Sequence, residues 1–317
     1  MRSLTRFALP LAALLLAACN APDDGEGMDE PIRVRGAQFL AGDLPGTPPG
    51  TEAQAGLPEI TAFDFTNPTV LPGQAQKSIQ GRTTDTAVAV AIRLADLGSG
   101  HWVLPVGAPD PQYPGELTWS LSADFSADVP AGLHALIVVA IDADGRAGVQ
   151  REQSLCFASR VPDNLHACNP DRAPPDVVVS LTWNVDADVD LVVRTPEGRL
   201  IGPKNPLVDP PDAGTPPPAG SSAIDRDSLS ACLPDGLRQE NLVFQKRPAA
   251  GSTFRIFADL FDACSAPSVS FRLEVFEARG EGKSRELTRT FGQSGVLTTF
   301  DQNGGTSPGV VIVDYLF

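Results

Sequence analysis

Short runs of alternating apolar and polar residues, separated by Gly, Pro, Asn and Asp, recur along most of this 317-residue chain. Alternation with a period of two places apolar side chains on one face of a β-strand, whereas an amphipathic helix repeats every 3.6 residues. In the first half, such runs occupy residues 60–65, 76–81, 87–94, 102–106, 117–121, 135–141 and 150–157. In the second half, they occupy residues 177–183, 189–194, 241–245, 253–260, 269–277, 287–291, 296–300 and 310–316. The chain is therefore predicted to be all-β.

Strands of this length and spacing favour sheets packed face to face. We expect two β-sandwich domains in series, at residues 57–160 and 176–317, with a linker at 161–175. Residues 19–56 are rich in Pro, Gly and acidic residues and lack periodic apolar positions, which predicts a disordered tether. The Pro-rich segment 203–222 is too long for a hairpin turn and is expected to form an exposed loop.

The N-terminus has the features of an export signal. Arg2 and Arg6 are followed by an apolar run at residues 7–16, which is too short to span a bilayer, and then by Leu16-Ala17-Ala18-Cys19. This tetrapeptide resembles the bacterial lipobox. The resemblance implies a signal peptide at 1–18, a diacylglycerol on the Cys19 sulfur and an acyl chain such as palmitate on its amine. Asn20, by the same resemblance, favours the outer membrane; an ordinary secretory signal is the alternative.

Four cysteines remain after Cys19, an even number that suits disulfides in an oxidising compartment. Of the three possible connectivities, the local one is expected, which joins Cys156 to Cys168 and Cys232 to Cys264. A zinc site is the alternative, but it would need closely spaced pairs such as CxxC, and the sequence has none.

The densest chemistry lies at residues 181–198, which read LTWNVDADVDLVVRTPEG. In one continuous strand, Asp186, Asp188 and Asp190 would share one face and the apolar residues the other. The alternative, which we favour, is a hairpin in which 181–184 pairs with 189–194, because Asp and Asn are depleted in strand interiors and common in turns. Either arrangement gathers three carboxylates beside Trp183.

Calcium takes six to eight oxygen ligands, and carboxylates supply them well. Further acidic residues could approach if the Pro-rich loop folds back, and Glu240 is one such candidate. The tentative ligands are Asp186, Asp188, Asp190, Asp225 and Asp227. The alternative is a solvated acidic turn in which Asp190 pairs with Arg226 or Arg238. The spacing does not match an EF-hand loop.

Two segments resemble known modules. Residues 130–134 read PAGLH and precede a strand that ends in Asp142-Ala143-Asp144-Gly145. This resembles the last hairpin of bacterial Ig-like and fibronectin-type modules, which implies an Ig-like sandwich at 57–160. Trp183, the run 188–191 and the strand entry at 248–254 resemble, in outline, pre-peptidase C-terminal-type β-sandwich modules of bacterial surface proteins, with a jelly roll as the alternative for 176–317. That resemblance covers most of 176–277, implies an accessory domain and brings no catalytic residues.

The net charge of −15, which becomes −17 without Arg2 and Arg6, disfavours nucleic-acid binding. His101, His134 and His166 lie outside any catalytic motif, and no HExxH or GxSxG is present, so we expect no enzyme. The expected function is that of an outer-membrane lipoprotein with a binding or structural role at the cell envelope. It would be attached to the membrane through its N-terminal lipid and would contact a protein or glycan ligand. The alternative is an accessory binding subunit of a secreted or surface hydrolase system.

Overall fold

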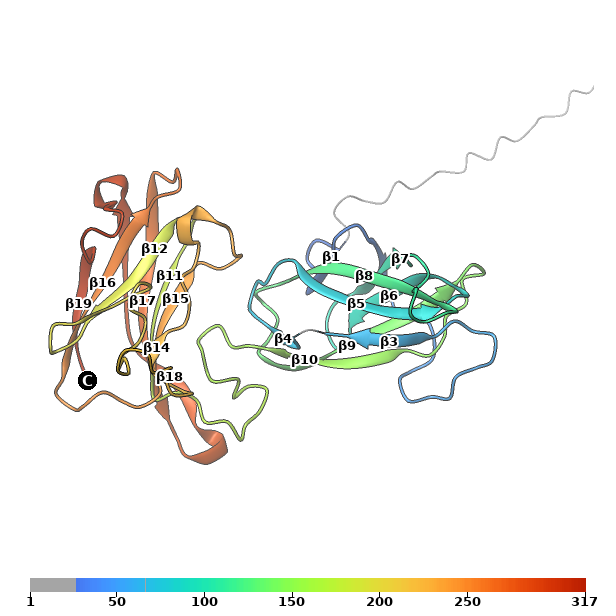
Figure 1. Cartoon of the computed structure of the whole chain (residues 1–317), viewed down its shortest axis with the longest axis horizontal. Helices are drawn as coiled ribbons and strands as arrows, with labels where there is room; N and C mark the ends of the chain where they lie inside the picture. Colours follow the sequence, from blue (N-terminus) through green and yellow to red (C-terminus); the bar gives the residue numbers. More distant parts are fainter. Residues whose placement is uncertain (1–26, 66) are drawn as a thin grey trace, which may run out of the picture.

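A computed structural model describes residues 27–65 and 67–317 of the chain (Figure 1). This part is all-β, as predicted: it contains strands, three short 3₁₀ turns and no α-helix. None of its helical segments is long and apolar enough to cross a membrane. The predicted signal peptide at 1–18 and the predicted lipidation site Cys19 lie outside the described residues.

The N-terminal sandwich consists of a four-stranded sheet and a six-stranded sheet. The smaller sheet has the order β1 (Ile32–Val34), β8 (Glu116–Phe125), β5 (Lys77–Thr84), β3 (Ile60–Asp64). The larger sheet has the order β2 (Gln38–Ala41), β7 (Gly100–Pro105), β6 (Ala87–Leu94), β9 (Gly132–Asp142), β10 (Arg151–Phe157), β4 (Thr69–Val70). Alternate residues of both sheets, such as Ile79 and Leu136, meet in one buried core.

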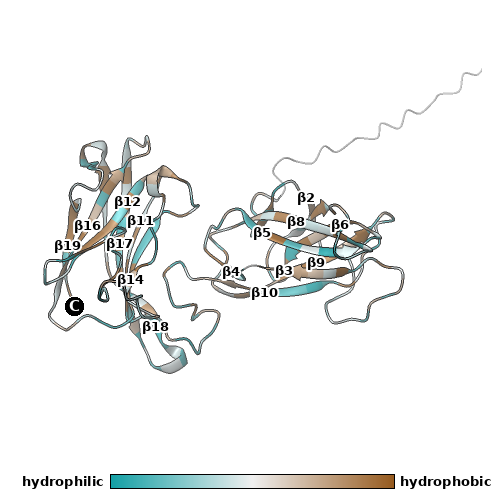
Figure 2. Cartoon of the chain, in the orientation of Figure 1, coloured by the Kyte–Doolittle hydropathy of each residue, from teal (hydrophilic) through white to brown (hydrophobic). Residues whose placement is uncertain are grey.

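The C-terminal sandwich consists of a five-stranded and a four-stranded sheet. The larger has the order β14 (Ala223–Ile224), β15 (Gln239–Phe244), β11 (Val177–Trp183), β17 (Ser268–Arg279), β18 (Glu286–Thr298). The smaller has the order β13 (Leu200–Ile201), β12 (Asp188–Arg194), β16 (Thr253–Asp262), β19 (Val310–Leu316). Figure 2 shows apolar residues concentrated along the strands of both sandwiches. No strand is shared between the two pairs of sheets.

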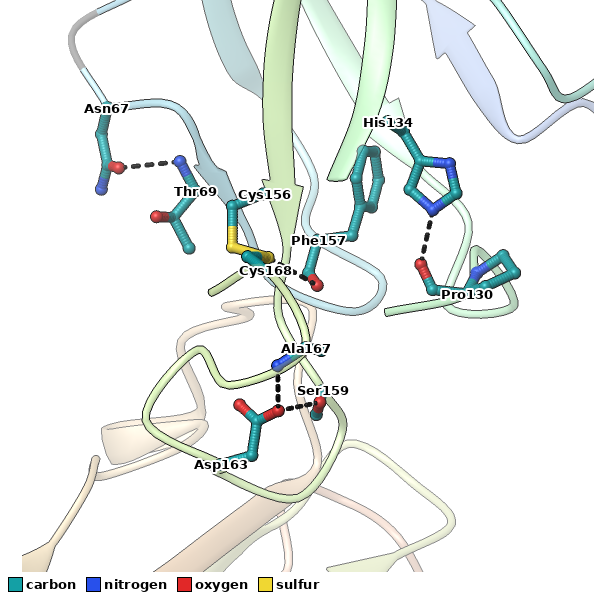
Figure 3. Close-up of a disulfide and its surroundings, with 10 residues drawn as sticks. All are labelled: Asn67, Thr69, Pro130, His134, Cys156, Phe157, Ser159, Asp163, Ala167 and Cys168. Atoms are coloured by element: carbon teal, nitrogen blue, oxygen red, sulfur yellow. Dashed lines mark hydrogen bonds between the residues drawn. A yellow bond between two sulfur atoms is a disulfide. The ribbon is translucent and has the colours of Figure 1, made fainter. Parts of the chain in front are cut away.

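Both predicted disulfides are present. Cys156, near the end of β10, is bonded to Cys168, which fastens the segment after the N-terminal sandwich back onto that strand (Figure 3). Within this segment, the Asp163 carboxylate accepts hydrogen bonds from the Ser159 hydroxyl at 2.7 Å and the Ala167 N–H at 2.9 Å. The second disulfide joins Cys232 to Cys264 in the C-terminal sandwich.

The predicted tether at 19–56 is too long, because residues 30–44 belong to the N-terminal sandwich. Ile32 and Val34 are buried in the core as part of β1, which pairs with β8, and β2 pairs with β7. The buried Glu30 carboxylate also accepts hydrogen bonds from the backbone and side chain of Ser99. Strands of three and four residues are too short to show a period. Only the Pro-, Gly- and acid-rich composition of the region was then informative, and it predicted a tether.

The predicted hairpin within residues 181–194 is wrong, and so is the continuous strand. β11 pairs with β15 and β17, whereas β12 pairs with β13 and β16, so the chain crosses from one sheet to the facing sheet through residues 184–187. The physical reason is burial. Leu181 and Leu191 belong to the core between the two sheets. Two strands in facing sheets bury their apolar faces against each other, whereas two strands of one hairpin lie side by side in a single layer.

Other differences concern strand limits. The two strands predicted at 287–291 and 296–300 form one strand, β18, which pairs with β17 over most of its length. Residues 299–301 form a 3₁₀ turn that leaves Phe300 exposed. The two-residue strands β4, β13 and β14 were not predicted, because two residues carry no periodicity.

Trp119 is the largest fully buried side chain of the N-terminal core, and it packs where its cross-strand neighbour Gly81 leaves room. A Cβ atom at Gly81 would lie 2.6 Å from the Trp119 ring and 2.2 Å from the Ala62 carbonyl oxygen. Both distances are far below van der Waals contact. Position 81 therefore requires glycine.

We predict that Gly81→Ala lowers the free energy of unfolding by about 1–3 kcal/mol, the usual cost of overpacking a core. Urea denaturation of the full chain measures this. Gly292→Ala in β18 is the matched control, because the atoms nearest to a Cβ there lie 4.0 Å away. Equal free energies for the two variants would contradict this account of the core.

Candidate metal centre

The face of β12 that points away from the core carries two aspartates. Val189, Leu191 and Val193 point into the core between the sheets. Because successive side chains of a strand point to opposite faces, Asp188 and Asp190 share the other face. Covering segments nevertheless bury them: Asp188 is 2% exposed and Asp190 is 8% exposed.

The neighbouring strand β16 adds two more carboxylates to the same region. Its residues Asp259 and Asp262 lie opposite Asp190 and Asp188 in the antiparallel pairing. Directly opposite side chains are close neighbours on one face of a sheet, and like charges at such positions are destabilising. The Asp259 carboxylate is hydrogen-bonded by the side-chain amide of Asn303, from the segment that follows β18.

A fifth aspartate comes from the loop of residues 225–232, which we call the covering loop. Carboxylate oxygens of Asp188, Asp190 and Asp227 all lie within 4.8 Å of one another. The loop is held there by the Ala231 N–H, which donates to Asp188 Oδ2 at 2.7 Å, and within the loop the Ser230 hydroxyl donates to Asp227 at 3.0 Å. We call the trio Asp188, Asp190 and Asp227 the aspartate cluster.

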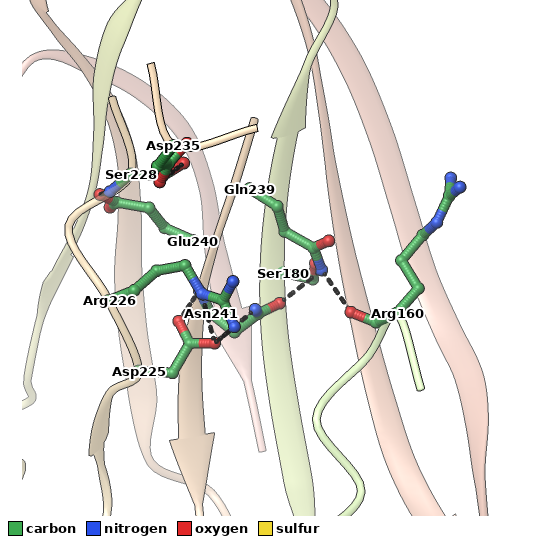
Figure 4. Close-up of polar contacts among 9 residues, drawn as sticks. All are labelled: Arg160, Ser180, Asp225, Arg226, Ser228, Asp235, Gln239, Glu240 and Asn241. Carbon is green, nitrogen blue, oxygen red and sulfur yellow. Dashed lines mark hydrogen bonds and ion pairs between the residues drawn. The ribbon is translucent and has the colours of Figure 1, made fainter. Parts of the chain in front are cut away.

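Glu240 connects the cluster to the facing sheet. This residue of β15 is 0% exposed. Its Oε2 accepts a hydrogen bond from the Leu191 N–H at 2.7 Å, and its Oε1 accepts one from the Ser228 N–H at 3.1 Å. Figure 4 shows Glu240 with its carboxylate at Ser228. Burial raises the pKa of Glu240 well above its usual value, and the nearby charges of Asp190 and Asp227 raise it further.

The cluster is under electrostatic strain. Burial, followed by the charges of Asp227, Asp262 and Asp259, raises the pKa of Asp188 to about 6. Burial, followed by the charge of Asp188 and then those of Asp227 and Asp259, raises the pKa of Asp190 to about 7. A raised carboxyl pKa means that the charged form is disfavoured, so a bound cation would relieve the repulsion.

Among the residues that the structure describes, Asp190 is the carboxylate of this region without a hydrogen-bond or ion-pair partner. Asp188, Asp227 and Asp259 each accept at least one hydrogen bond. Within residues 27–65 and 67–317, Asp190 receives no hydrogen bond and no ion pair; only the more distant charge of Lys204 acts in its favour. Side chains as buried as Asp190 usually have a partner, and its oxygens, which are not fully enclosed, can take an ion or water as that partner.

A pocket of about 200 Å³ opens beside Asp190 and Asp259. Its remaining walls come from residues 200–205 and 305–308, which include Lys204. The oxygens of Asp190 therefore have solvent access on one side, which leaves room for water molecules to complete the coordination of an ion.

Two of the predicted ligands lie elsewhere. Asp186 is on the crossover between the sheets, exposed, and paired with Arg238 at 2.8 Å. Asp225 accepts hydrogen bonds from the backbone and side chain of Asn241 and pairs with Arg226 (Figure 4). The predicted alternative pairing of Asp190 with Arg226 or Arg238 is also wrong, because both arginines are engaged by these other aspartates.

Asp259 and Asp262 are not among the ligands predicted from the sequence, and Glu240 is there only one candidate. One signal was available: residues 253–262 read TFRIFADLFD, in which a carboxylate interrupts an apolar run. A charged residue inside a strand that is otherwise apolar is rarely placed without a partner or a function. Pairing of β16 with β12 could not be read from this pattern, because the two strands are separated by about 60 residues of sequence.

No protein family matches this sequence, and no curated protein matches it. Among solved structures, the chain is similar to dimeric latent PorU from Porphyromonas gingivalis, with 11% identity and a TM-score of 0.20 over 88% of this chain and 21% of that chain. The chain thus spans 21% of the length of that protein. It is also similar to the C-terminal domain of the AgI/II polypeptide BspA from Streptococcus agalactiae, with 12% identity and a TM-score of 0.22 over 76% of this chain and 100% of that domain.

The raised pKa of Asp190 predicts a pH dependence in the absence of metal. A carboxyl group whose pKa is higher in the folded than in the unfolded protein adds stability at pH values below its unfolded pKa. This stability is lost as the pH rises through the folded pKa. Relative to Asp190→Asn, which mimics the protonated form, the wild type should lose stability between about pH 4 and pH 7. The loss should reach a few kcal/mol, because one pKa unit corresponds to about 1.4 kcal/mol.

Chemical denaturation in chelator across this pH range measures the difference. Asp186→Asn is the control, since Asp186 is exposed, and its difference from the wild type should not vary in this way. If the profiles of Asp190→Asn and the wild type run parallel, Asp190 is not a strained buried carboxylate.

Proposed function

We propose that this protein is a lipid-anchored outer-membrane protein with a non-catalytic binding or structural role at the cell envelope, and that calcium stabilises its C-terminal sandwich. The lipobox-like sequence at Cys19 supports the anchor. Two disulfides support an oxidising compartment, where such bonds form and persist. The sandwiches would bind a protein or glycan ligand.

The observation that carries the calcium proposal is the unpaired Asp190 carboxylate, 8% exposed and within 4.8 Å of the oxygens of Asp188 and Asp227. Three carboxylates at this separation repel one another when ionised, and the burial of Asp188 and Asp190, though not of the exposed Asp227, strengthens the repulsion. A divalent cation among them would turn repulsion into attraction. The ion would supply the partner that Asp190 otherwise lacks.

The donor set favours calcium among the common divalent ions. Each residue of the aspartate cluster can offer a carboxylate oxygen as a ligand. Hard oxygen donors suit calcium and magnesium rather than zinc or copper. Calcium accepts six to eight ligands in irregular geometry, with water filling the remainder, whereas magnesium demands near-ideal octahedral coordination. Three carboxylates from two different segments, with an adjacent pocket for water, fit the more tolerant ion.

The cation would have a structural effect as well. Asp188 and Asp190 belong to a strand of the four-stranded sheet, while Asp227 belongs to the covering loop. An ion shared among them would fasten that loop to the sheet. It would hold the surface of the sandwich in one shape, which is what a domain that presents a binding surface requires.

We predict that the C-terminal sandwich melts at a higher temperature in millimolar calcium than in chelator. A ligand at 100 times its Kd adds about 2.7 kcal/mol, which corresponds to a rise of several degrees for a domain of this size. Differential scanning calorimetry of the full chain measures the shift. Magnesium should give a smaller one.

The variants Asp188→Asn and Asp190→Asn, combined in one chain, should abolish the calcium-induced shift. Asp186→Asn is the matched control: it removes a neighbouring carboxylate of the same acidic stretch that lies outside the cluster, and it should keep the full shift. If the wild type melts at the same temperature in calcium and in chelator, the calcium site is contradicted and these aspartates form a solvated acidic surface.

The anchor is tested separately. Cys19→Ser removes the sulfur that would receive the diacylglycerol, so the variant should appear in the soluble fraction after detergent-free lysis while the wild type remains with membranes. Membrane fractionation and immunoblotting measure the distribution. A variant that stays with the outer membrane to the same extent as the wild type would contradict the lipid anchor.

A further inference from the structure

The disulfide Cys232–Cys264 lies beside Asp262, the residue of β16 that is paired with Asp188 of the proposed calcium site. The two sulfur atoms and a carboxylate oxygen of Asp262 lie within 4.8 Å of one another. Cys232 ends the covering loop that carries Asp227, and Cys264 follows the strand that carries Asp262. The disulfide therefore joins the covering loop, which carries Asp227, to the segment that follows β16.

The backbone around this disulfide is held in an unfavourable conformation. Five non-glycine residues on its two sides have positive φ angles: Leu229 (58°), Ala231 (52°), Cys232 (61°), Cys264 (48°) and Ser265 (75°). Residues with a side chain adopt this region rarely and at a cost in free energy. Such conformations persist only where the surroundings fix them, so something must hold these two segments in place.

The contacts that hold them form a closed ring through the site. The Ala231 N–H donates to Asp188 Oδ2 at 2.7 Å, and the next residue, Cys232, is bonded to Cys264. The Cys264 N–H donates to Asp262 Oδ1 at 2.8 Å, and Asp262 lies opposite Asp188 in the strand pairing. In this closed series of contacts, the disulfide is the covalent link between the covering loop and the segment after β16.

We propose that the Cys232–Cys264 disulfide is a positioning element of the cation site, so that its reduction by a dithiol weakens divalent-cation binding. This inference rests on the calcium site proposed above. In the reduction, the dithiol becomes a disulfide, and its electron pair and two protons convert Cys232 and Cys264 to two thiols. Both cysteines are partly exposed, which gives a small dithiol access to them.

The physical reason is the loss of preorganisation. Without the covalent link, the left-handed residues of the covering loop are free to relax to ordinary conformations, and Asp227 moves with them. The loop then keeps its hydrogen bonds to Asp188, Glu240 and Asn241. Ordering Asp227 again would consume part of the binding free energy of the ion, and the measured affinity would fall accordingly.

The other disulfide provides a matched control within the same chain. Cys156–Cys168 fastens the segment after β10 and has no residue in common with the aspartate cluster. Its removal should lower stability through the unfolded chain, as the loss of any disulfide does, without altering the cation site.

The first test compares calcium binding by isothermal titration to three forms of the full chain: wild type, Cys232→Ser with Cys264→Ser, and Cys156→Ser with Cys168→Ser. The first pair of substitutions should raise the Kd for calcium about tenfold or more, within the usual range of coupling between sites. The second pair should leave it unchanged. A wild-type Kd in the Cys232→Ser, Cys264→Ser form would overturn the inference while leaving the calcium site intact; no binding to the wild type would overturn both.

A second test needs no substitution. Coupling is reciprocal, so bound calcium must protect the Cys232–Cys264 disulfide from reduction by the same factor by which the disulfide improves calcium binding. Wild type is equilibrated with increasing dithiothreitol in calcium or in chelator, then alkylated and mapped by mass spectrometry. Calcium should shift reduction of Cys232–Cys264 to about tenfold higher dithiol to oxidised-dithiol ratios and leave Cys156–Cys168 unaffected. Identical reduction of Cys232–Cys264 in both conditions would contradict the coupling.

Discussion

Repulsion among buried carboxylates on the outer face of β12 is the constraint on which the C-terminal sandwich depends. The strand period places Asp188 and Asp190 opposite the core, and pairing with β16 brings Asp259 and Asp262 beside them. The segments that cover this face are held by the carboxylates themselves, through the Ala231 N–H and the Asn303 amide. The fold therefore brings the charges together and encloses them with the same contacts.

The N-terminal sandwich also contains buried charged groups, and their partners can be compared with those of the aspartate cluster. The buried Glu30 carboxylate accepts a hydrogen bond from Ser99, and the buried Asp142 pairs with Arg146 at 2.8 Å. Both ring nitrogens of His134 face acceptors, one the Asp96 carboxylate and the other the Pro130 carbonyl, the second of which Figure 3 shows. Each group has a partner within the chain. Asp190 has none among the described residues, and this contrast within one protein is why we assign a ligand to the C-terminal cluster.

Local patterns predicted the strands, and contacts between distant segments decided the site. β6, β11 and β19 match the limits that alternation gives, because a period of two is a property of each run by itself. Whether residues 181–194 turn back or cross depends on their pairing with β15, β16 and β17, which begin more than 40 residues further along the chain. For the same reason Asp186, adjacent in sequence, lies outside the cluster, while Asp259, distant in sequence, lies beside it.

The most direct test of the account is a crystal structure of the C-terminal sandwich region within the full chain, grown in calcium and examined for anomalous scattering. The account predicts one peak bound by carboxylate oxygens of Asp188, Asp190 and Asp227 at about 2.3–2.6 Å, the usual range for calcium. Water alone at that position, with Asp190 hydrogen-bonded to a protein donor such as the Lys204 ammonium, would contradict it.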